Sequence, residues 1–137
     1  MLHKHSKDFR MIFTSYFANI RNLPPNCIPI SIAQFPPKGF VSQGGLEYKT
    51  LAPPKNLLMK VQQDHNHREY ILSYKHEVLD KLDKSQVYQE LLDMSNGQTV
   101  VLCCYEKPEK FCHRKIVQKW LGITEWCEDM STENSLF

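Results

Sequence analysis

Long hydrophobic runs are missing from this 137-residue chain, and no apolar segment approaches the roughly 18 residues of a membrane span. The first ten residues, MLHKHSKDFR, are polar and charged, and no secretory signal is visible behind them. Repeats and low-complexity tracts are also missing. These absences predict a single soluble domain, with no membrane partner and a cytoplasmic location.

Cysteine is scarce and unevenly placed. The chain has five cysteines, an odd count, and Cys103 and Cys104 are adjacent. This pattern makes a poor disulfide framework, so we expect all five to be free thiols in a reducing compartment. Cysteine is also a favoured small core residue, which is the simplest interpretation of Cys103.

The charge of the chain is divided between a body and a tail. Four of the 15 acidic residues lie in residues 124–137, whereas all 17 basic residues lie before them, which leaves residues 1–123 at about +6. We therefore expect a single domain over 1–123 and an acidic, flexible tail over 124–137. The basic body permits an anionic partner such as a nucleotide, or a nucleic acid, without the concentrated basic face of a dedicated nucleic-acid binder.

Short apolar runs alternate with helical periodicity, which predicts a small α/β domain with helices packed against a mainly parallel sheet. Residues 100–102 are apolar on both faces, so they should pair with residues 12–14 inside the sheet. Ser85 is the expected N-cap of one helix, and Gly97 its expected stop. The expected strands are 11–17, 27–33 and 99–105, the expected helices are 56–63, 68–82, 85–95 and 112–122, and a Pro- and Gly-rich loop covers 34–56.

The stretch VVLCCYEKPEKFCHRKIVQKWL, residues 100–121, gathers most of the reactive side chains. Side chains alternate along a strand, so Cys104 and Glu106 should be neighbours at the carboxyl end, where open parallel sheets bind ligands. Cys112, His113 and Arg114 fall in the first turn of the next helix, where the helix dipole favours an anion and lowers a thiol pKa. One pocket could contain all five.

Several chemistries compete for such a pocket. Cys112 or Cys104 could act as a thiolate nucleophile with His113 or Glu106 as its base. Alternatively, Glu106 could handle a proton while Arg114, Lys107 or Lys110 holds a phosphate or carboxylate. In a purely architectural arrangement, Glu106 and Arg114 would form an ion pair that only ties the loop to the helix.

A zinc site is a further alternative. Cys104, Cys112 and His113 would supply three ligands, and the fourth would come from residues 64–67 or from Cys127. A cysteine eight positions before a Cys-His pair is not a standard zinc spacing, so no metal ligand is assigned. No motif identifies a cofactor.

Three stretches, TSYFANIRNLP (14–24), LAPPKNLL (51–58) and VLCCYEKPEKFCHRKIVQKWL (101–121), resemble the family called domain of unknown function 488, in the short form of bacterial and phage genomes. The resemblance spans about Ile12 to Leu121. Its signature, Cys-x-Glu followed after five residues by Cys-His-Arg, implies a compact α/β fold with these residues clustered. Longer members carry Asp-x-Arg after the first strand; Asn19-Ile20-Arg21 stands here, so only Arg21 is carried over.

The leading hypothesis is a cytoplasmic enzyme or sensor that binds a small anionic ligand such as a nucleotide or a nucleic-acid fragment. Ser15, Asn19 and Arg21 would face the Cys104 to Arg114 cluster. The alternatives are a non-catalytic interaction protein and a zinc-binding protein. An open pocket requires Arg21, Arg114 and Glu106 in one cleft, whereas architecture requires them paired and closed. The expected catalytic residues are Glu106, Cys104, Cys112 and His113, and the expected ligand-binding residues are Arg114, Arg21, Asn19, Ser15, Tyr16 and Lys107.

Overall fold

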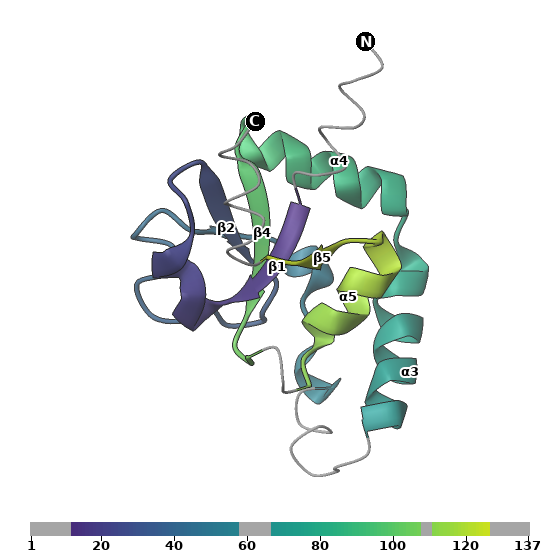
Figure 1. The fold of residues 1–137 in the computed structure, drawn as a ribbon. Helices are drawn as coiled ribbons and strands as arrows, with labels where there is room; N and C mark the ends of the chain where they lie inside the picture. Colours follow the sequence, from purple (N-terminus) through teal and green to yellow (C-terminus); the bar gives the residue numbers. More distant parts are fainter. Residues whose placement is uncertain (1–11, 58–66, 108–110, 127–137) are drawn as a thin grey trace.

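The computed structural model describes residues 12–57, 67–107 and 111–126. Within these ranges, five strands form one sheet in the order β3-β2-β4-β1-β5, and every neighbouring pair is parallel (Figure 1). The strands are β1 (Ile12–Tyr16), β2 (Cys27–Ser31), β3 (Leu46–Glu47), β4 (Thr99–Cys104) and β5 (Thr124–Glu125). The helices are α3 (His67–Glu77), α4 (Lys84–Ser95) and α5 (His113–Leu121), with short 3-10 turns η1 (Phe17–Asn22), η2 (Lys49–Leu51) and η3 (Leu79–Lys81).

Strand β4 is the centre of the sheet. Val100, Val101 and Leu102 are fully buried, because a parallel strand covered on both faces needs apolar side chains on both. Val100 pairs with Ile12 of β1 on one side and with Ile28 of β2 on the other. The predicted α/β fold class and the predicted interior pairing of residues 100–102 with 12–14 are therefore confirmed.

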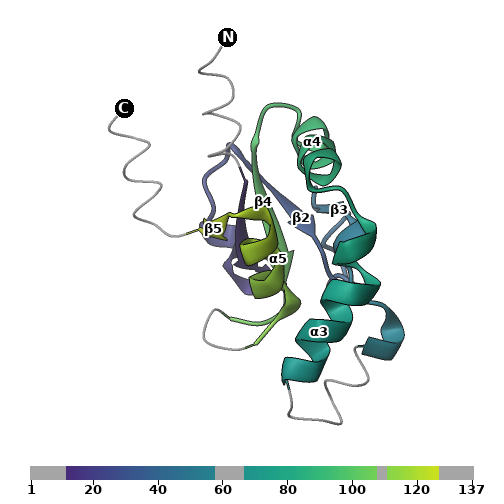
Figure 2. The same cartoon turned by 90° about the vertical axis from the view of Figure 1, so that its right-hand side faces the viewer.

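The three α-helices lie on one side of the sheet, as Figure 2 shows. The main core forms where they meet it: Val100 and Leu102 of β4 pack with Leu91 of α4 and Val117 of α5. Tyr74 of α3 is fully buried in the same core. This face contributes most of the apolar burial that stabilises the domain.

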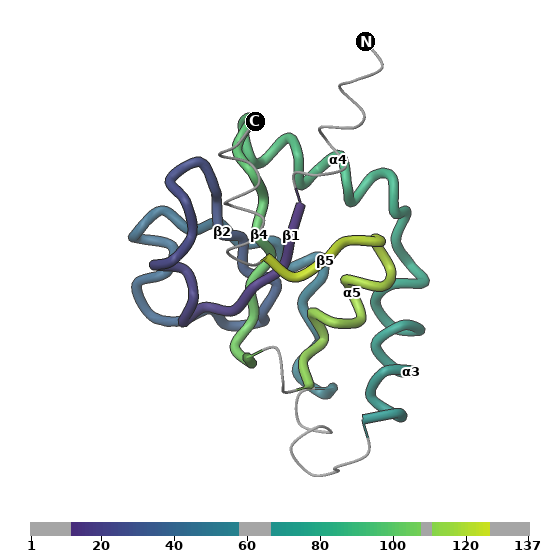
Figure 3. Tube along the Cα trace, in the orientation of Figure 1, coloured from purple at the N-terminus to yellow at the C-terminus, as the bar shows by residue number. Residues whose placement is uncertain are grey.

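The opposite face is covered by η1 and by the chain between β2 and β3. Figure 3 shows these two segments lying together on that side. The ring of Phe17 packs edge-on against the ring of Phe40, with centroids 5.2 Å apart. Val101 and Cys103 are buried here, as their alternation with Val100 and Leu102 requires. The Pro- and Gly-rich loop expected over 34–56 thus contains β3 and η2. Its part before β3 covers this face, whereas Leu51 of η2 packs in the main core on the helical side.

The ends of α4 differ in part from the expectation. Its N-cap is Asp83, whose carboxylate accepts a hydrogen bond from the Gln86 N–H at 3.2 Å, so the prediction of Ser85 was wrong. A carboxylate reaches this position as well as a hydroxyl does. The helix ends as expected: Asn96 and Gly97 both have positive φ, and glycine takes that conformation without strain. Most of the expected helix 56–63 lies outside the described residues.

The expected boundary after residue 123 was wrong. Thr124 and Glu125 form β5 beside β1, and the Trp126 N–H donates to the Thr14 carbonyl at 2.8 Å. Burial of Ile123 and Trp126 holds this segment against the sheet despite its acidic composition. The remainder of the predicted tail, 127–137, lies outside the described residues.

Among the described residues, none of the helices combines the length and the apolar character that crossing a membrane would require.

Candidate functional site

A cavity of about 470 Å³ opens at the carboxyl end of β4, within the size range of small-molecule sites. We call it the Cys112 pocket. Its walls come from the end of β4, the start of α5, the chain after β2 and one residue of α3. They are formed by Ala33, Gln34, Phe35, Pro53, Tyr70, Cys104, Tyr105, Glu106, Phe111, Cys112 and His113.

The backbone at the end of β4 and at the start of α5 determines where these side chains lie. Cys104 is the last residue of β4 and points to the helical side, as Leu102 does, while Glu106 lies just beyond the strand. Cys112 is the extended N-cap residue of α5, and among the described residues no side chain caps this helix end. The first backbone N–H groups of α5 therefore lie next to the Cys112 pocket, where they favour an anion.

His113 is fixed in one tautomer. Its Nε2 lies 2.7 Å from the carbonyl oxygen of Ile32, which can only accept, so Nε2 carries the hydrogen. Its Nδ1 then keeps a lone pair and lies 3.7 Å from Sγ of Cys112. Burial lowers the pKa of His113 to about 4, against the opposing effect of the Ile32 hydrogen bond. The ring is therefore a neutral proton acceptor at pH 7.

The cysteines divide into two groups. Cys104 and Cys112 meet at the Cys112 pocket, as expected, but their sulfur atoms are joined as a disulfide, so the prediction of free thiols was wrong for these two. The carboxyl end of β4 and the start of α5 converge there, which brings the two sulfurs together. Cys103 and Cys27 are free, and burial raises the pKa of Cys103 to about 12. Cys127 lies outside the described residues.

Glu106 is the exposed carboxylate of the site. Its side chain lies in the wall of the Cys112 pocket, and no hydrogen bond or ion pair to it occurs within the described ranges. Its backbone is engaged, since its carbonyl oxygen accepts from Nη1 of Arg114 at 2.7 Å. The carboxylate is available to a ligand.

Arg114 is closed off from the Cys112 pocket, contrary to its predicted role as a ligand-binding residue. It is fully buried, and its Nη1 donates to the carbonyl oxygens of Ser15, at 2.8 Å, and Glu106. Its ion pair is with Glu125, whose Oε1 lies 3.3 Å from Nε, and not with the Glu106 carboxylate. The guanidinium also lies 5.9 Å from the centroid of the Tyr16 ring. Arg114 thus links three segments: β1, β5 and the chain just after β4.

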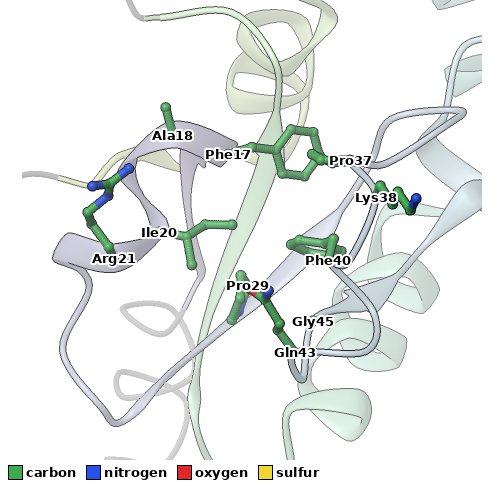
Figure 4. A pocket seen from close by; sticks show the side chains of 10 residues that line it. All are labelled: Phe17, Ala18, Ile20, Arg21, Pro29, Pro37, Lys38, Phe40, Gln43 and Gly45. Atoms are coloured by element: carbon green, nitrogen blue, oxygen red, sulfur yellow. The ribbon is translucent and has the colours of Figure 1, made fainter.

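Ser15, near the end of β1, and Asn19 and Arg21, just after it, do not line the Cys112 pocket, so that prediction was also wrong. Thr14 points to α5, where it accepts from Gln118 Nε2, and alternation along β1 therefore turns Ser15 to the opposite face. Ser15 is buried and accepts from Asn19 Nδ2 at 3.1 Å. Arg21 lines a different cavity, shown in Figure 4.

Two further predicted ligand-binding residues lie outside the wall of the Cys112 pocket. Tyr16 is half-buried beside Arg114, and Lys107 is exposed one residue beyond Glu106. Neither belongs to the lining.

Sequence reasoning missed the aromatic walls. Phe35, Tyr70, Tyr105 and Phe111 all line the Cys112 pocket, and the Tyr70 and Phe111 rings meet at nearly 90°. The helical periodicity of residues 68–82 indicated that Tyr70 is a core residue. Tyr70 does pack in the core, but it also lines the pocket. The length of the loop that begins at residue 34 was the one signal for Phe35.

Within the described ranges, no three His, Cys, Asp or Glu side chains come together as a potential metal site. The additional zinc ligands considered above lie mainly outside these ranges, at residues 64–66 and 127.

The fold and the motif together define a parallel α/β domain with a Cys-x-Glu and a Cys-His-Arg segment at one end of its central strand. The chain belongs to the DUF488 family: the model of DUF488-N3a, described as the active DUF488-N3 subclade, matches residues 13–124. No curated protein and no solved structure matches the chain.

Proposed function

We propose that this protein binds a nucleotide or a similar anionic, ring-containing ligand in the Cys112 pocket. The observation that carries the proposal is the pairing of four aromatic walls with the unengaged carboxylate of Glu106. Aromatic rings stack on nucleobases regardless of base identity. A carboxylate accepts hydrogen bonds from the exocyclic and ring N–H groups of a base.

The anionic part of such a ligand has a natural place at the start of α5. Among the described residues, no side chain caps the first N–H groups, those of His113 and Arg114, while the Lys115 N–H donates to the Cys112 carbonyl; the helix dipole adds positive potential there. The buried guanidinium of Arg114 lies behind this end and stays charged, although burial lowers its pKa from the ordinary value. A phosphate at this end would be held by backbone donors.

Ligand titration would test the proposal. A nucleoside monophosphate should bind and raise the melting temperature, its parent nucleoside should bind more weakly, and inorganic phosphate should bind weakest. Glu106→Gln should weaken nucleotide binding at least tenfold, because the amide loses the negative charge and replaces one of the two acceptor oxygens by an NH2 donor. Glu77→Gln, at the end of α3, is the matched control. Equal affinity of Glu106→Gln and wild type would contradict the proposal.

Thiol chemistry is a second candidate, favoured by the 3.7 Å contact between Nδ1 of His113 and Sγ of Cys112. In reduced protein the neutral imidazole would accept the thiol proton and activate Cys112 as a nucleophile. Cys104→Ser removes the disulfide partner and isolates this pair. Iodoacetamide should then alkylate Cys112 much faster than Cys103, and His113→Gln should slow the reaction. Equal rates at the two cysteines would exclude an activated thiol.

A further inference from the structure

A second cavity, of about 330 Å³, lies on the face of the sheet opposite the α-helices. We call it the Arg21 pocket. Figure 4 shows Phe17, Phe40 and Pro29 in its middle, with Arg21 and Lys38 on opposite sides of them. It is lined by Phe17, Ala18, Ile20, Arg21, Pro29, Pro37, Lys38, Phe40, Gln43 and Gly45.

The charges of this lining have one sign. Arg21 and Lys38 are exposed, and the lining holds no carboxylate. Within the described part of the chain, neither cation has an ion-pair partner. Two unpaired cations beside an apolar floor fit an anionic ligand that also carries flat apolar groups.

The floor of the Arg21 pocket depends on one glycine. A Cβ placed on Gly45 would lie 2.5 Å from the ring of Phe40, far inside van der Waals contact. The missing side chain allows this ring to lie against the backbone, where it also contacts Phe17. Close packing against Gly45 and Phe17 therefore fixes the position of the Phe40 ring.

Aromatic rings connect the Arg21 pocket with the Cys112 pocket. Phe17 of the first contacts Tyr105 of the second, with ring centroids 4.8 Å apart. Tyr105 is 53% exposed, and its hydroxyl donates to the carbonyl of Phe35, which is 57% exposed. An aromatic row, half-buried at Phe17 and exposed at Tyr105 and Phe35, thus runs from one pocket to the other, past the carboxyl end of β4.

We infer that the two pockets are successive subsites for one single-stranded nucleic acid. This inference rests on the proposed function and extends the ligand from a nucleotide to a strand. One nucleotide occupies the Cys112 pocket, neighbouring bases stack on Tyr105 and Phe17, and the phosphates beyond them lie near Arg21 and Lys38. Stacking platforms beside a few cations are the usual means of binding single strands without sequence preference.

Fluorescence anisotropy with a short labelled oligothymidylate and an oligouridylate tests the inference, with thymidine monophosphate as the reference ligand. At least one strand should bind tighter than the mononucleotide, and the stronger of the two shows which of these strands the protein prefers. Arg21→Ala and Lys38→Ala should each weaken strand binding about three- to tenfold, so the ratio of strand to mononucleotide affinity falls. Each should also reduce the slope of log K against log salt by about 0.7. The matched control Lys81→Ala, an exposed lysine of η3, should bind as wild type does.

Gly45→Ala is an independent probe, because it displaces Phe40 without changing any charge. It should weaken strand binding and leave the salt slope unchanged; its melting temperature shows whether the domain remains folded. Strand affinities of Arg21→Ala and Lys38→Ala equal to that of Lys81→Ala would overturn the inference. If nucleotides bind in a Glu106-dependent way under those conditions, the proposed function survives alone. If strands bind through Arg21 and Lys38 but no mononucleotide binds, the Arg21 pocket is supported and the proposed function fails.

Discussion

Glu106 and Arg114 belong to the same short motif, yet they lie in opposite surroundings. The Glu106 carboxylate faces an open pocket and is unengaged within the described ranges, whereas Arg114 is fully buried and contacts β1, β5 and the exit of β4. A motif found at one end of a central strand can thus combine a ligand-facing half with a half that holds the strand ends together. Stability and binding should respond differently to changes in each half.

Loss of Arg114 should have the largest effect on stability. Arg114→Ala leaves the Glu125 carboxylate without its cation and removes the Arg114 donor from the buried carbonyl oxygen of Ser15 and the partly buried one of Glu106. Removing one partner of a buried pair costs about 3–5 kcal/mol, which corresponds to a fall of about 10 °C or more in melting temperature. Thermal denaturation would measure this. A shift of only a few degrees would mean that Arg114 is not the anchor.

His113 should make the stability depend on pH. Burial lowers its folded-state pKa to about 4, below the ordinary 6.5, so only the unfolded state binds a proton between these values. Stability is complete above pH 6.5 and is lost as the pH falls towards 4, by about 2–3 kcal/mol at pH 4.5. Melting of wild type and His113→Gln at pH 7 and 4.5 would isolate this contribution. A wild type that loses no more than the variant would contradict the buried neutral ring.

Glu125 should matter less than its partner. Glu125→Gln keeps the oxygen that accepts from Thr14 and Gln118 and removes only the charge beside Arg114. Since this side chain is 27% exposed, water compensates in part, and we expect a loss of about 1–2 kcal/mol in urea denaturation. A loss as large as that of Arg114→Ala would place the carboxylate, and not the backbone contacts, at the centre of the anchor.

Glu106→Gln should have the smallest effect on stability and a large effect on ligand binding. Its side chain is exposed, and such substitutions usually change stability by less than about 0.5 kcal/mol. The melting temperature of the unliganded variant should therefore match that of wild type. A fall of more than about 10 °C would assign Glu106 to the architecture.

The strongest local patterns predicted the sheet. Residues 100–102 are apolar at every position, which fits only a central strand, and Cys104 and Cys112 met as the alternation of β4 and the start of α5 required. The position of Glu125 could not be predicted in this way. Its acidic surroundings suggested a tail, whereas Ile123 and Trp126 on either side of it fix the segment by long-range burial.

The candidate site was harder to predict because it depends on which face each segment covers. Ser15 lies near the end of β1 with its side chain on the face opposite the helices, and Arg21 follows on the same face in η1; no local pattern records which face that is. Similarly, the Cys-His-Arg segment gives no sign that its arginine points inward. The role of a polar residue at a strand end depends on tertiary packing that a single sequence does not encode locally.

The order of the strands also constrains how the chain folds during synthesis. Strands β1 and β2 are made first, yet they do not pair with each other, because β4 lies between them. Ile12 and Ile28 must both wait for Val100, far along the chain. Closing such long loops slows folding and leaves unpaired strands exposed until β4 emerges from the ribosome. The domain should therefore form its sheet late in translation.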